Sequence, residues 1–520
     1  MTIEADEFTA GGGVLPPDIS CGTAPPPPEA PRVPRGVPPP AFDWMGIIGT
    51  GEDLSVGREG RPLLSTGPSH GNLKLVDNGP EPRFETTRFL DVGPLVEPIR
   101  SLTNVGLDER HSYPDNIAGE TPHWMMASEM TVLAKAMGLP DLVSLHTVAG
   151  ESGGPMSALR KDGTSRPYER SLYETRAAVE FARARKLRFG VGGVVLTHGE
   201  SDATSPSYEA ELVQLASDYA KDIRDITGQS QPVPVLVSQQ HAFPGRGDAA
   251  LRSTSTLATW LASTKRPDLL TCVGPKYQYD YIDSVRLRPH ATRRLGIKLA
   301  QAWAQQVLSA KRFRPLEPIA VTREGNVVRV AFFVPVSPLG WDEVLPTPHP
   351  EEKHPWAAGK GFELEDSAGP LRIGGVRIVD STVEITALEG PRGPLVVRYA
   401  MTQDTAGAPG PRAGEGDGRM GLLRDSEPLV GVDDEELTVS FEAQSDLVRG
   451  DFARHGRYDL VVGSGLPPGT AIKERFETPE GTVARLSTTW TGVSCKGRIR
   501  VRSNQRNYAV AFELPVPWSP

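Results

Sequence analysis

Five short apolar runs, alternating with segments of helical pattern, constrain the fold of this chain more than any other feature. The runs are residues 43–49 (DWMGIIG), 141–150 (DLVSLHTVAG), 190–198 (GVGGVVLTH), 232–239 (PVPVLVSQ) and 269–274 (LLTCVG). Their near-continuous apolar character is typical of strands that are covered on both faces. Helical patterns follow at about 121–138, 171–187, 205–228, 249–264 and 290–310. Alternating strands and helices predict right-handed βαβ units, and hence an α/β domain with a parallel sheet over residues 42–312.

The rest of the chain has different sequence patterns. From residue 313, short β-branched segments separated by turn signals, such as 326–336 (NVVRVAFFVPV) and 395–401 (LVVRYAM), predict an antiparallel β-sandwich over 313–427. A further strand-rich stretch, 428–520, extends the sandwich or forms a third domain. Glycine and proline dominate residues 1–41, which predicts a flexible, extended N-terminal segment, and residues 404–419 are typical of a mobile loop.

Composition excludes several classes of protein. A net charge of −9 without a basic stripe argues against nucleic acid as a partner. No run of about 18 apolar residues exists, so no membrane span is expected. The three cysteines are far apart and match no metal-ligand spacing, so no metal and no cofactor are predicted. The acidic first twenty residues lack the apolar core of a signal peptide, which predicts a soluble, cytoplasmic protein. Export or lipid anchoring at Cys21 would require a precursor that begins upstream of Met1.

Polar residues follow the predicted strands. In an open parallel sheet, ligands bind beyond the carboxyl ends of the strands, so the segments just after each run are the natural place for a site. These segments are 49–57 (GTGEDLSVG), 150–155 (GESGGP), 197–203 (THGESDA) and 281–287 (YIDSVRL).

The residues of these segments and their order along the chain resemble those of the SGNH hydrolase superfamily, and in particular of its sialate O-acetylesterase-like carbohydrate esterase branch. The resemblance covers roughly residues 42–310 and is strongest at HGESDA. It implies a three-layer α/β/α sandwich (flavodoxin-like) with a parallel sheet, and an esterase that acts on acetylated carbohydrates. In that branch the first block carries the nucleophilic serine, the second and third contribute to the oxyanion hole, and the last carries the histidine base with its carboxylate.

This chain departs from the pattern at both central positions. Asp53 occupies the serine position, with Glu52 in place of the usual glutamine, and Arg286 occupies the histidine position, while Asp283 matches the carboxylate. An arginine side chain stays protonated and cannot serve as the base. The resemblance and the paired change predict contact between Asp53 and Arg286. The plain interpretation is a structural salt bridge that fills an inactive site.

Three catalytic alternatives stay open. Asp53 is a possible carboxylate nucleophile, with His198 or Glu200 activating water. Asp53 or Glu52 is a possible general base, with Arg286 holding an anionic substrate. Ser152, in a Gly-Glu-Ser-Gly-Gly context that fits a nucleophile elbow, is a third candidate, with His198 as its base.

A second group of residues is predicted to bind substrate or to stabilise an oxyanion. The group comprises Gly51, Gly150, Gly153, His198, Glu200, Asp202 and Tyr281. Tyr281 closes an alternating series with Tyr277 and Tyr279, a pattern of one face of an extended segment that sugar-binding clefts also use.

Three functional hypotheses follow. The first is a diverged SGNH-type hydrolase or acyl transferase that acts on an acylated carbohydrate or related ester, with a site rebuilt around Asp53 and Arg286. The second is a pseudoenzyme that binds such a small-molecule or carbohydrate ligand. The third is an enzyme of another class that uses Asp53 for acid–base chemistry, for epoxide cleavage or for glycoside cleavage. The preserved oxyanion-side blocks favour the first narrowly, and the sequence does not indicate an oligomeric state.

Overall fold

The computed structural model describes residues 41–77, 89–99, 119–139, 141–241, 252–283, 285–343, 345–403, 419–428 and 505–517, and the backbone of strands within 435–502. Residues 1–40 of the predicted N-terminal segment, which include Cys21, and residues 404–418 of the predicted loop lie outside the described residues. These residues divide into two compact units, one formed by the chain up to Ser426 with Asn507–Pro520, the other by Glu427–Arg506.

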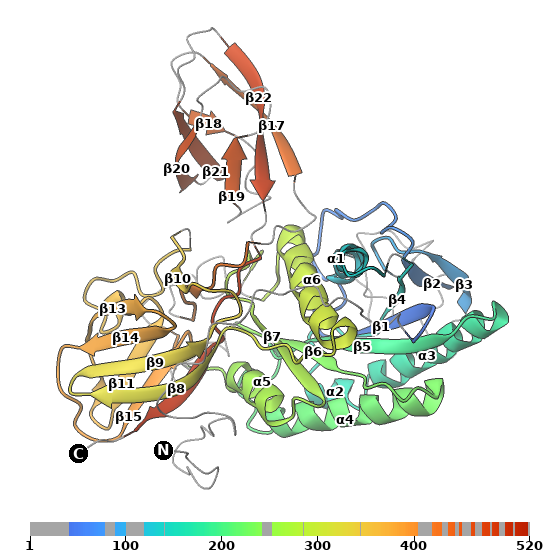
Figure 1. The fold of residues 1–520 in the computed structure, drawn as a ribbon, viewed down its shortest axis with the longest axis horizontal. Helices are drawn as coiled ribbons and strands as arrows, with labels where there is room; N and C mark the ends of the chain where they lie inside the picture. The colour runs from blue at the N-terminus through green and yellow to red at the C-terminus, as the bar shows by residue number, and fades with distance from the viewer. Residues whose placement is uncertain are drawn as a thin grey trace. The chain divides into compact units, whose positions relative to one another are not determined.

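A mixed seven-stranded sheet forms the centre of the α/β domain within the described residues (Figure 1). Its order is β3 (Phe89–Pro94), β2 (Leu73–Asp77), β4 (Val143–Val148), β1 (Trp44–Gly51), β5 (Phe189–Thr197), β6 (Val235–Gln239) and β7 (Leu270–Pro275). All neighbours are parallel except β2 and β3, which pair antiparallel at one edge. Five of these strands coincide with the predicted apolar runs, and the sheet confirms the predicted α/β domain.

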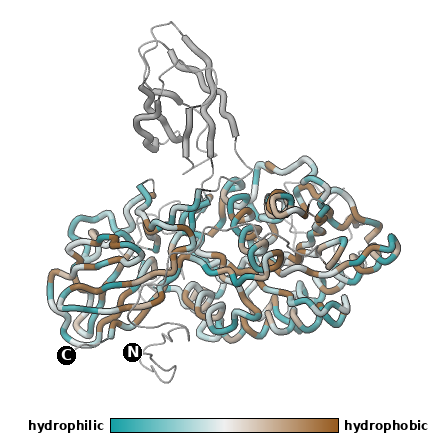
Figure 2. The backbone as a smooth tube through the Cα atoms, in the orientation of Figure 1, coloured by the Kyte–Doolittle hydropathy of each residue, from teal (hydrophilic) through white to brown (hydrophobic). Residues whose placement is uncertain are grey.

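The helices cover both faces of this sheet, as Figure 1 shows. They are α1 (His123–Ala136), α2 (Met156–Leu159), α3 (Pro167–Ala184), α4 (Tyr208–Thr227), α5 (Thr254–Lys265), α6 (Pro289–Trp303) and a π-helical turn at Ala304–Leu308. Successive strand residues point to opposite faces. Ile47 therefore belongs to a buried cluster that includes residues of α1 and α6, while Ile48 belongs to one that includes residues of α3, α4 and α5. Hydrophobic residues accordingly follow the strands in Figure 2.

Local sequence explains where the helices begin and end. Buried apolar residues of α4 recur at helical spacing, at Leu212, Leu215, Tyr219 and Ile223, and Gly228 closes this helix in the left-handed conformation with φ +71°. Ser253 caps α5 by accepting a hydrogen bond from the backbone N–H of Thr256 at 3.3 Å. These signals are the ones that the sequence analysis used, and all five predicted helices are present.

A β-rich region follows the α/β domain, as predicted. Two four-stranded antiparallel sheets pair in the orders β12-β11-β15-β23 and β13-β14-β9-β8, and β10 pairs with β16. The strands are β8 (Glu317–Glu324), β9 (Val327–Phe333), β10 (Gly340–Trp341), β11 (Phe362–Asp366), β12 (Gly369–Pro370), β13 (Ile373–Val379), β14 (Thr382–Ala387), β15 (Leu395–Tyr399), β16 (Leu423–Arg424) and β23 (Phe512–Val516), with a 3-10 turn at Ala357–Gly359.

The C-terminal segment that leads into β23 joins the β-rich region to the α/β domain. The Gln239 side chain exchanges two hydrogen bonds of 2.8 Å with the backbone of Ala511, and the Tyr277 hydroxyl donates to the carbonyl of Ala509 at 2.7 Å. Both regions therefore belong to one compact unit. The predicted division at residues 312 and 313 stays a prediction.

The second unit is built from antiparallel strands in two three-stranded sheets, β17-β22-β19 and β18-β21-β20. These strands are β17 (Glu435–Glu442), β18 (Leu447–Arg449), β19 (Asp459–Val462), β20 (Ala471–Thr478), β21 (Gly481–Ser487) and β22 (Ser494–Arg502). The strand-rich pattern predicted after residue 428 thus corresponds partly to this unit and partly to β23. None of the helices in the described part of the chain combines the length and the apolar character that a membrane crossing requires.

Candidate functional site

The structure brings the four polar segments together at the carboxyl edge of the sheet. The backbone N–H of Glu151 donates to the carbonyl of Gly51 at 2.9 Å, which joins the first and second segments. The N–H of Glu52 donates to the carbonyl of Thr197 at 3.0 Å, which joins the first and third. Arg286 reaches the first segment through its side chain. The predicted convergence of these segments at one edge of the sheet is therefore present, and their role as a functional site stays a prediction.

Asp53 lies at the centre of this group and is 4% exposed. Nε of Arg286 donates to Oδ2 of Asp53 at 2.7 Å, and the Ser152 hydroxyl donates to Oδ1. The predicted contact between Asp53 and Arg286 is thus present. Each carboxylate oxygen of Asp53 has a donor, so the charge of this nearly buried group is compensated.

Arg58 is a site residue that the sequence analysis missed. It ends the turn that follows β1, where its backbone N–H donates to the carbonyl of Asp53 at 3.0 Å. Its side chain folds back so that Nη1 donates to the Ser152 hydroxyl and lies 3.8 Å from Oδ1 of Asp53. Two guanidinium groups, from Arg58 and Arg286, therefore flank one carboxylate.

Asp283 and Arg286 form a local turn that aims the guanidinium. Oδ1 of Asp283 accepts hydrogen bonds from the backbone N–H groups of Val285 and Arg286 at 2.8 and 2.7 Å. Its Oδ2 accepts from Nη1 of Arg286 at 2.6 Å. Burial opposes the charge of Arg286, but the charges of Asp53 and Asp283 outweigh it and raise the pKa of the guanidinium. The two carboxylates are thus joined through Arg286.

Glu52 is committed to organising the third segment. Its carboxylate accepts the backbone N–H groups of Gly199 and Glu200 at 2.9 Å and of Ser201 at 3.2 Å, and the Ser201 hydroxyl donates to it as well. Burial raises the pKa of Glu52, but the neighbouring His198 charge and these hydrogen bonds overcome that effect and lower it. A carboxylate held in this way positions a loop and is poorly placed to take a substrate proton.

His198 is engaged on both ring nitrogens. Nδ1 forms a hydrogen bond of 3.1 Å with the Tyr208 hydroxyl, and Nε2 forms one of 3.0 Å with the carbonyl of Gly154. The ring stacks on Tyr208, and the side chain is fully buried. Within the described residues, its hydrogen bonds thus go to neither Ser152 nor Asp53, the two nucleophiles that it was predicted to serve.

The remaining predicted residues, Asp202, Glu200 and Tyr281, contact neighbouring segments of the protein. Asp202 accepts a hydrogen bond from the backbone N–H of Met156 at 2.6 Å and so fixes the start of α2. Glu200 pairs with the fully buried Lys276, and burial raises the pKa of Glu200. Lys276 directly follows β7, so the rule for residues after strands is a signal that could have found it. Tyr281 is 1% exposed and presents no face to a ligand. Its neighbours in the alternating series, Tyr277 and Tyr279, are 1% and 4% exposed.

Two of the predicted glycines permit close approach between segments. A Cβ atom on Gly150 would lie 2.3 Å from the Ser55 hydroxyl oxygen and 2.6 Å from the carbonyl oxygen of Gly51. Gly51 itself has φ +132°, and its Cβ would lie 2.1 Å from the carbonyl oxygen of Thr197. Gly153 has φ +69° and open space around it. The first two glycines therefore pack the segments against one another.

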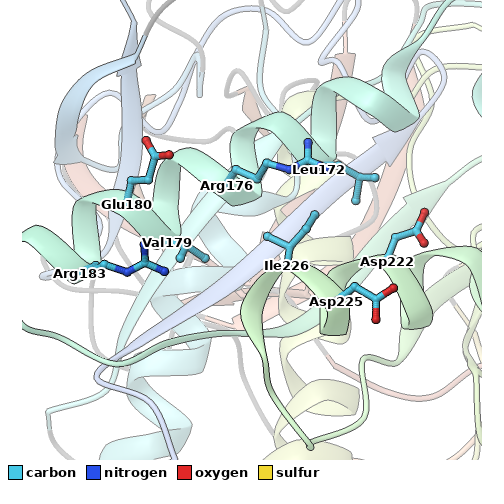
Figure 3. Close-up of a pocket in the computed structure, with 8 residues that line it drawn as sticks. All are labelled: Leu172, Arg176, Val179, Glu180, Arg183, Asp222, Asp225 and Ile226. Carbon is cyan, nitrogen blue, oxygen red and sulfur yellow. The ribbon is translucent and has the colours of Figure 1, made fainter.

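A pocket of about 560 Å³ lies elsewhere, between α3 and α4 (Figure 3). Its lining residues are Leu172, Arg176, Val179, Glu180, Arg183, Asp222, Asp225 and Ile226. None of the predicted site residues belongs to this lining. Within the described residues, no group of three or more His, Cys, Asp or Glu side chains is arranged to hold a metal ion.

Comparisons with known proteins give distant structural likenesses. No protein-family model matches the sequence, and no curated protein matches it either. Among solved structures, a carbohydrate acetylesterase from Xanthomonas citri is 13% identical, with a TM-score of 0.44 over 73% of this chain and 77% of that one. NanS is 13% identical, with a TM-score of 0.31 over 52% of this chain and 98% of its own. A carbohydrate acetylesterase from Sinorhizobium meliloti is 11% identical, with a TM-score of 0.25 over 49% and 97%. At these TM-scores the likenesses assign no function to the site, which rests on its own geometry.

Proposed function

We propose that this protein binds an acylated carbohydrate or a related ester on an SGNH-like, three-layer α/β/α domain, without the serine–histidine hydrolysis of that superfamily. The observation that carries the proposal is the ion pair between Asp53 and Arg286, at the two positions where the resemblance places the nucleophile and the base. The ligand class follows from the sequence resemblance.

The chemistry of the ion pair supports binding over hydrolysis. Ester hydrolysis of this type needs an activated hydroxyl beside a group that takes its proton near neutral pH. Arg286 keeps its proton, and its neighbours raise its pKa further. Asp53 is flanked by two guanidinium groups, and both of its carboxylate oxygens already accept hydrogen bonds from the protein. His198 is occupied by Tyr208 and Gly154.

The same residues offer groups for recognition. The Arg58 side chain is 37% exposed and that of Arg286 is 22% exposed. Ser152, between them in the hydrogen-bond network, is partly exposed as well. Arginine N–H groups suit the carbonyl and hydroxyl oxygens of an acylated sugar, and the opposing charges of Asp53 and Asp283 keep the site close to neutral.

One observation favours a second candidate, a hydrolase or acyl transferase with Ser152 as nucleophile. The Ser152 hydroxyl already donates its proton toward Asp53. In this reaction the Ser152 oxygen would attack the ester carbonyl, Asp53 would accept the proton, and the alcohol would leave with a proton returned from Asp53. Water would then release the acyl group from Ser152.

A single set of variants separates these functions. The wild type, Asp53→Ser/Arg286→His and Ser152→Ala are compared for turnover of an activated acetate ester and of acetylated sugars. Binding of the same sugars is measured by calorimetry. The matched control adds Asp283→Asn to the double variant, which removes the carboxylate that would orient the new histidine.

The proposal predicts sugar binding without turnover by the wild type and turnover by the double variant. Since loss of a triad member costs on the order of a million-fold, even incomplete repair should exceed background by about a hundred-fold. Turnover by the wild type that Ser152→Ala abolishes would establish the second candidate instead. If the wild type neither binds nor cleaves any of the sugars, both functions are wrong.

A further inference from the structure

A pair of buried glutamates lies behind the segment that carries Arg58. Glu97 is 3% exposed, and its Oε1 accepts the backbone N–H of Thr121 at 3.2 Å and also the Thr121 hydroxyl. Its Oε2 is shielded from solvent and has no hydrogen-bond partner among the described residues. An ionised carboxylate would be poorly solvated there, so this geometry favours the neutral acid.

Glu120, the second glutamate, is 1% exposed and holds a different stretch of chain. Its carboxylate accepts the backbone N–H groups of Leu64 and Ser65 at 2.8 and 3.1 Å, and the Ser65 hydroxyl. The carbonyl of Ser65 accepts in turn from the backbone N–H of Glu97 at 2.8 Å. The two glutamates therefore share Ser65 as a common neighbour.

These contacts fix residues 57–65, called the strap below. The backbone N–H of Glu120 donates to the carbonyl of Gly60 at 2.7 Å, and that of Gly60 donates to the carbonyl of Gly57 at 2.9 Å. Gly57, with φ +69°, leaves room for the carbonyl of Gly119, which would lie 2.5 Å from a Cβ atom there. Arg58 lies within the strap, so its position beside Ser152 depends on these contacts.

The charges around the pair leave one proton at Glu97. Burial and the neighbouring Glu120 carboxylate raise the pKa of Glu97 to about 8, although Lys74 on β2 opposes this effect. Burial also raises the pKa of Glu120, which Arg293 on α6 opposes. His123 at the start of α1 adds no positive charge, because burial lowers its pKa to about 3.

We propose that Glu97 and Glu120 form a proton-controlled latch on the strap, in which release of the strap is coupled to loss of the proton from Glu97. In the closed state Glu97 is a neutral acid beside the Glu120 carboxylate. In the released state Glu97 reaches solvent and ionises. Rising pH therefore favours release and withdraws Arg58 from Ser152. The consequence for ligand binding rests on the proposed function, whereas the latch itself does not.

Hydrogen exchange of the strap tests the latch. Deuterium uptake of a peptide that covers residues 57–65 is measured by mass spectrometry in the wild type and in Glu97→Gln. Comparison at equal pH cancels the intrinsic pH dependence of exchange. Glu363→Gln is the matched control, since Glu363 is another buried carboxyl whose pKa burial raises, bonded to Met401 and Thr402 in the β-rich region.

The opening equilibrium of the strap should rise by about 10-fold per pH unit between about pH 6 and about pH 8 in the wild type and in Glu363→Gln. Glu97→Gln should lack this rise. Equal pH profiles in the wild type and Glu97→Gln would overturn the latch.

A second measurement needs only the wild type and so stands if Glu97→Gln does not fold. Tryptic cleavage after Arg58, relative to cleavage after the exposed Lys161, should increase over the same pH range. A constant ratio would overturn the latch. If exchange responds to pH as expected while sugar affinity does not, the latch stands and the role of Arg58 in binding is wrong.

Discussion

Nε of Arg286 lies 2.7 Å from Oδ2 of Asp53, although 233 positions of the chain separate the two residues. The contact closes the site at the point where the first and last polar segments meet. It joins a nearly buried carboxylate to a guanidinium that Asp283 holds from the other side. The site is therefore a network of paired charges. Its members should contribute differently to the free energy of unfolding.

Asp53→Asn should lower the free energy of unfolding more than Asp283→Asn does. The Asp53 side chain is 6% exposed, so its loss of charge leaves two guanidinium groups with weaker partners, and we expect a cost of about 1–3 kcal/mol. Asp283 is 39% exposed, and solvent limits its contribution to about 1 kcal/mol or less. Urea denaturation of the three proteins measures the difference, and equal losses would contradict the assigned roles.

Glu52→Gln should remove a part of the folding stability that is present at neutral pH and lost in acid. Because folding lowers the pKa of Glu52, its ionised form stabilises the protein above the unfolded-state pKa of about 4.3, and this stabilisation is lost as the pH falls below that value. The wild type should therefore exceed Glu52→Gln in stability at neutral pH, and the difference should shrink below about pH 4. Thermal denaturation across that range checks the sign. A difference that grows in acid would show that another group dominates.

Two glycine substitutions should differ in cost. Gly150→Ala forces a methyl group against the Ser55 hydroxyl and the carbonyl of Gly51, and we expect a loss of about 1–3 kcal/mol. Gly153→Ala meets no atom within 4 Å, and its positive φ should cost about 1 kcal/mol. Denaturant midpoints of the two variants provide the comparison. A larger loss for Gly153→Ala would mean that the second segment is packed differently.

Glu97→Gln should change how stability depends on pH. Above the unfolded-state pKa of about 4.3, the unfolded chain loses the proton of Glu97 while the folded chain keeps it up to a pKa of about 8. The wild type should lose on the order of 1 kcal/mol per pH unit in this window relative to Glu97→Gln, and the difference should level off above it. Denaturation at a series of pH values measures the slope. Parallel profiles would show that Glu97 ionises normally in the folded protein.

Sequence reasoning succeeded where a long pattern and a terminating residue agree. The helix predicted at 205–228 is α4, with its apolar stripe and its closing Gly228. Sequence reasoning missed β2 (LKLVD) and β3 (FLDVGP), in which charged residues interrupt the apolar ones, and β3 lies at the sheet edge, where Leu90 is 63% exposed. An exposed edge strand carries no continuous apolar run, so the pattern used for the central strands does not detect it.

The candidate site likewise contains contacts that could be predicted from the sequence and contacts that could not. Contact between Asp53 and Arg286 was predicted because the resemblance places the two residues at the positions of a nucleophile and its base, which lie side by side in that superfamily. Arg58 was not, because its side chain reaches Ser152 through a turn whose geometry depends on the strap. The commitment of His198 to Tyr208 and Gly154 also depends on tertiary packing, which residue order does not specify.

The return of the chain at Asn507 has a consequence for how this protein is assembled. Asp425 and Asn507 are linked by three hydrogen bonds of 2.6 to 2.9 Å, and Arg424 pairs with Tyr508 as neighbouring strand residues do. These two segments are therefore held together where the second unit, Glu427–Arg506, begins and ends, and this unit is called the cassette. A cassette whose ends are already fastened together can be shortened, exchanged or deleted at little entropic cost to the host. We therefore expect changes of length or sequence within Glu427–Arg506 to leave the hydrogen bonds between Asp425 and Asn507 in place.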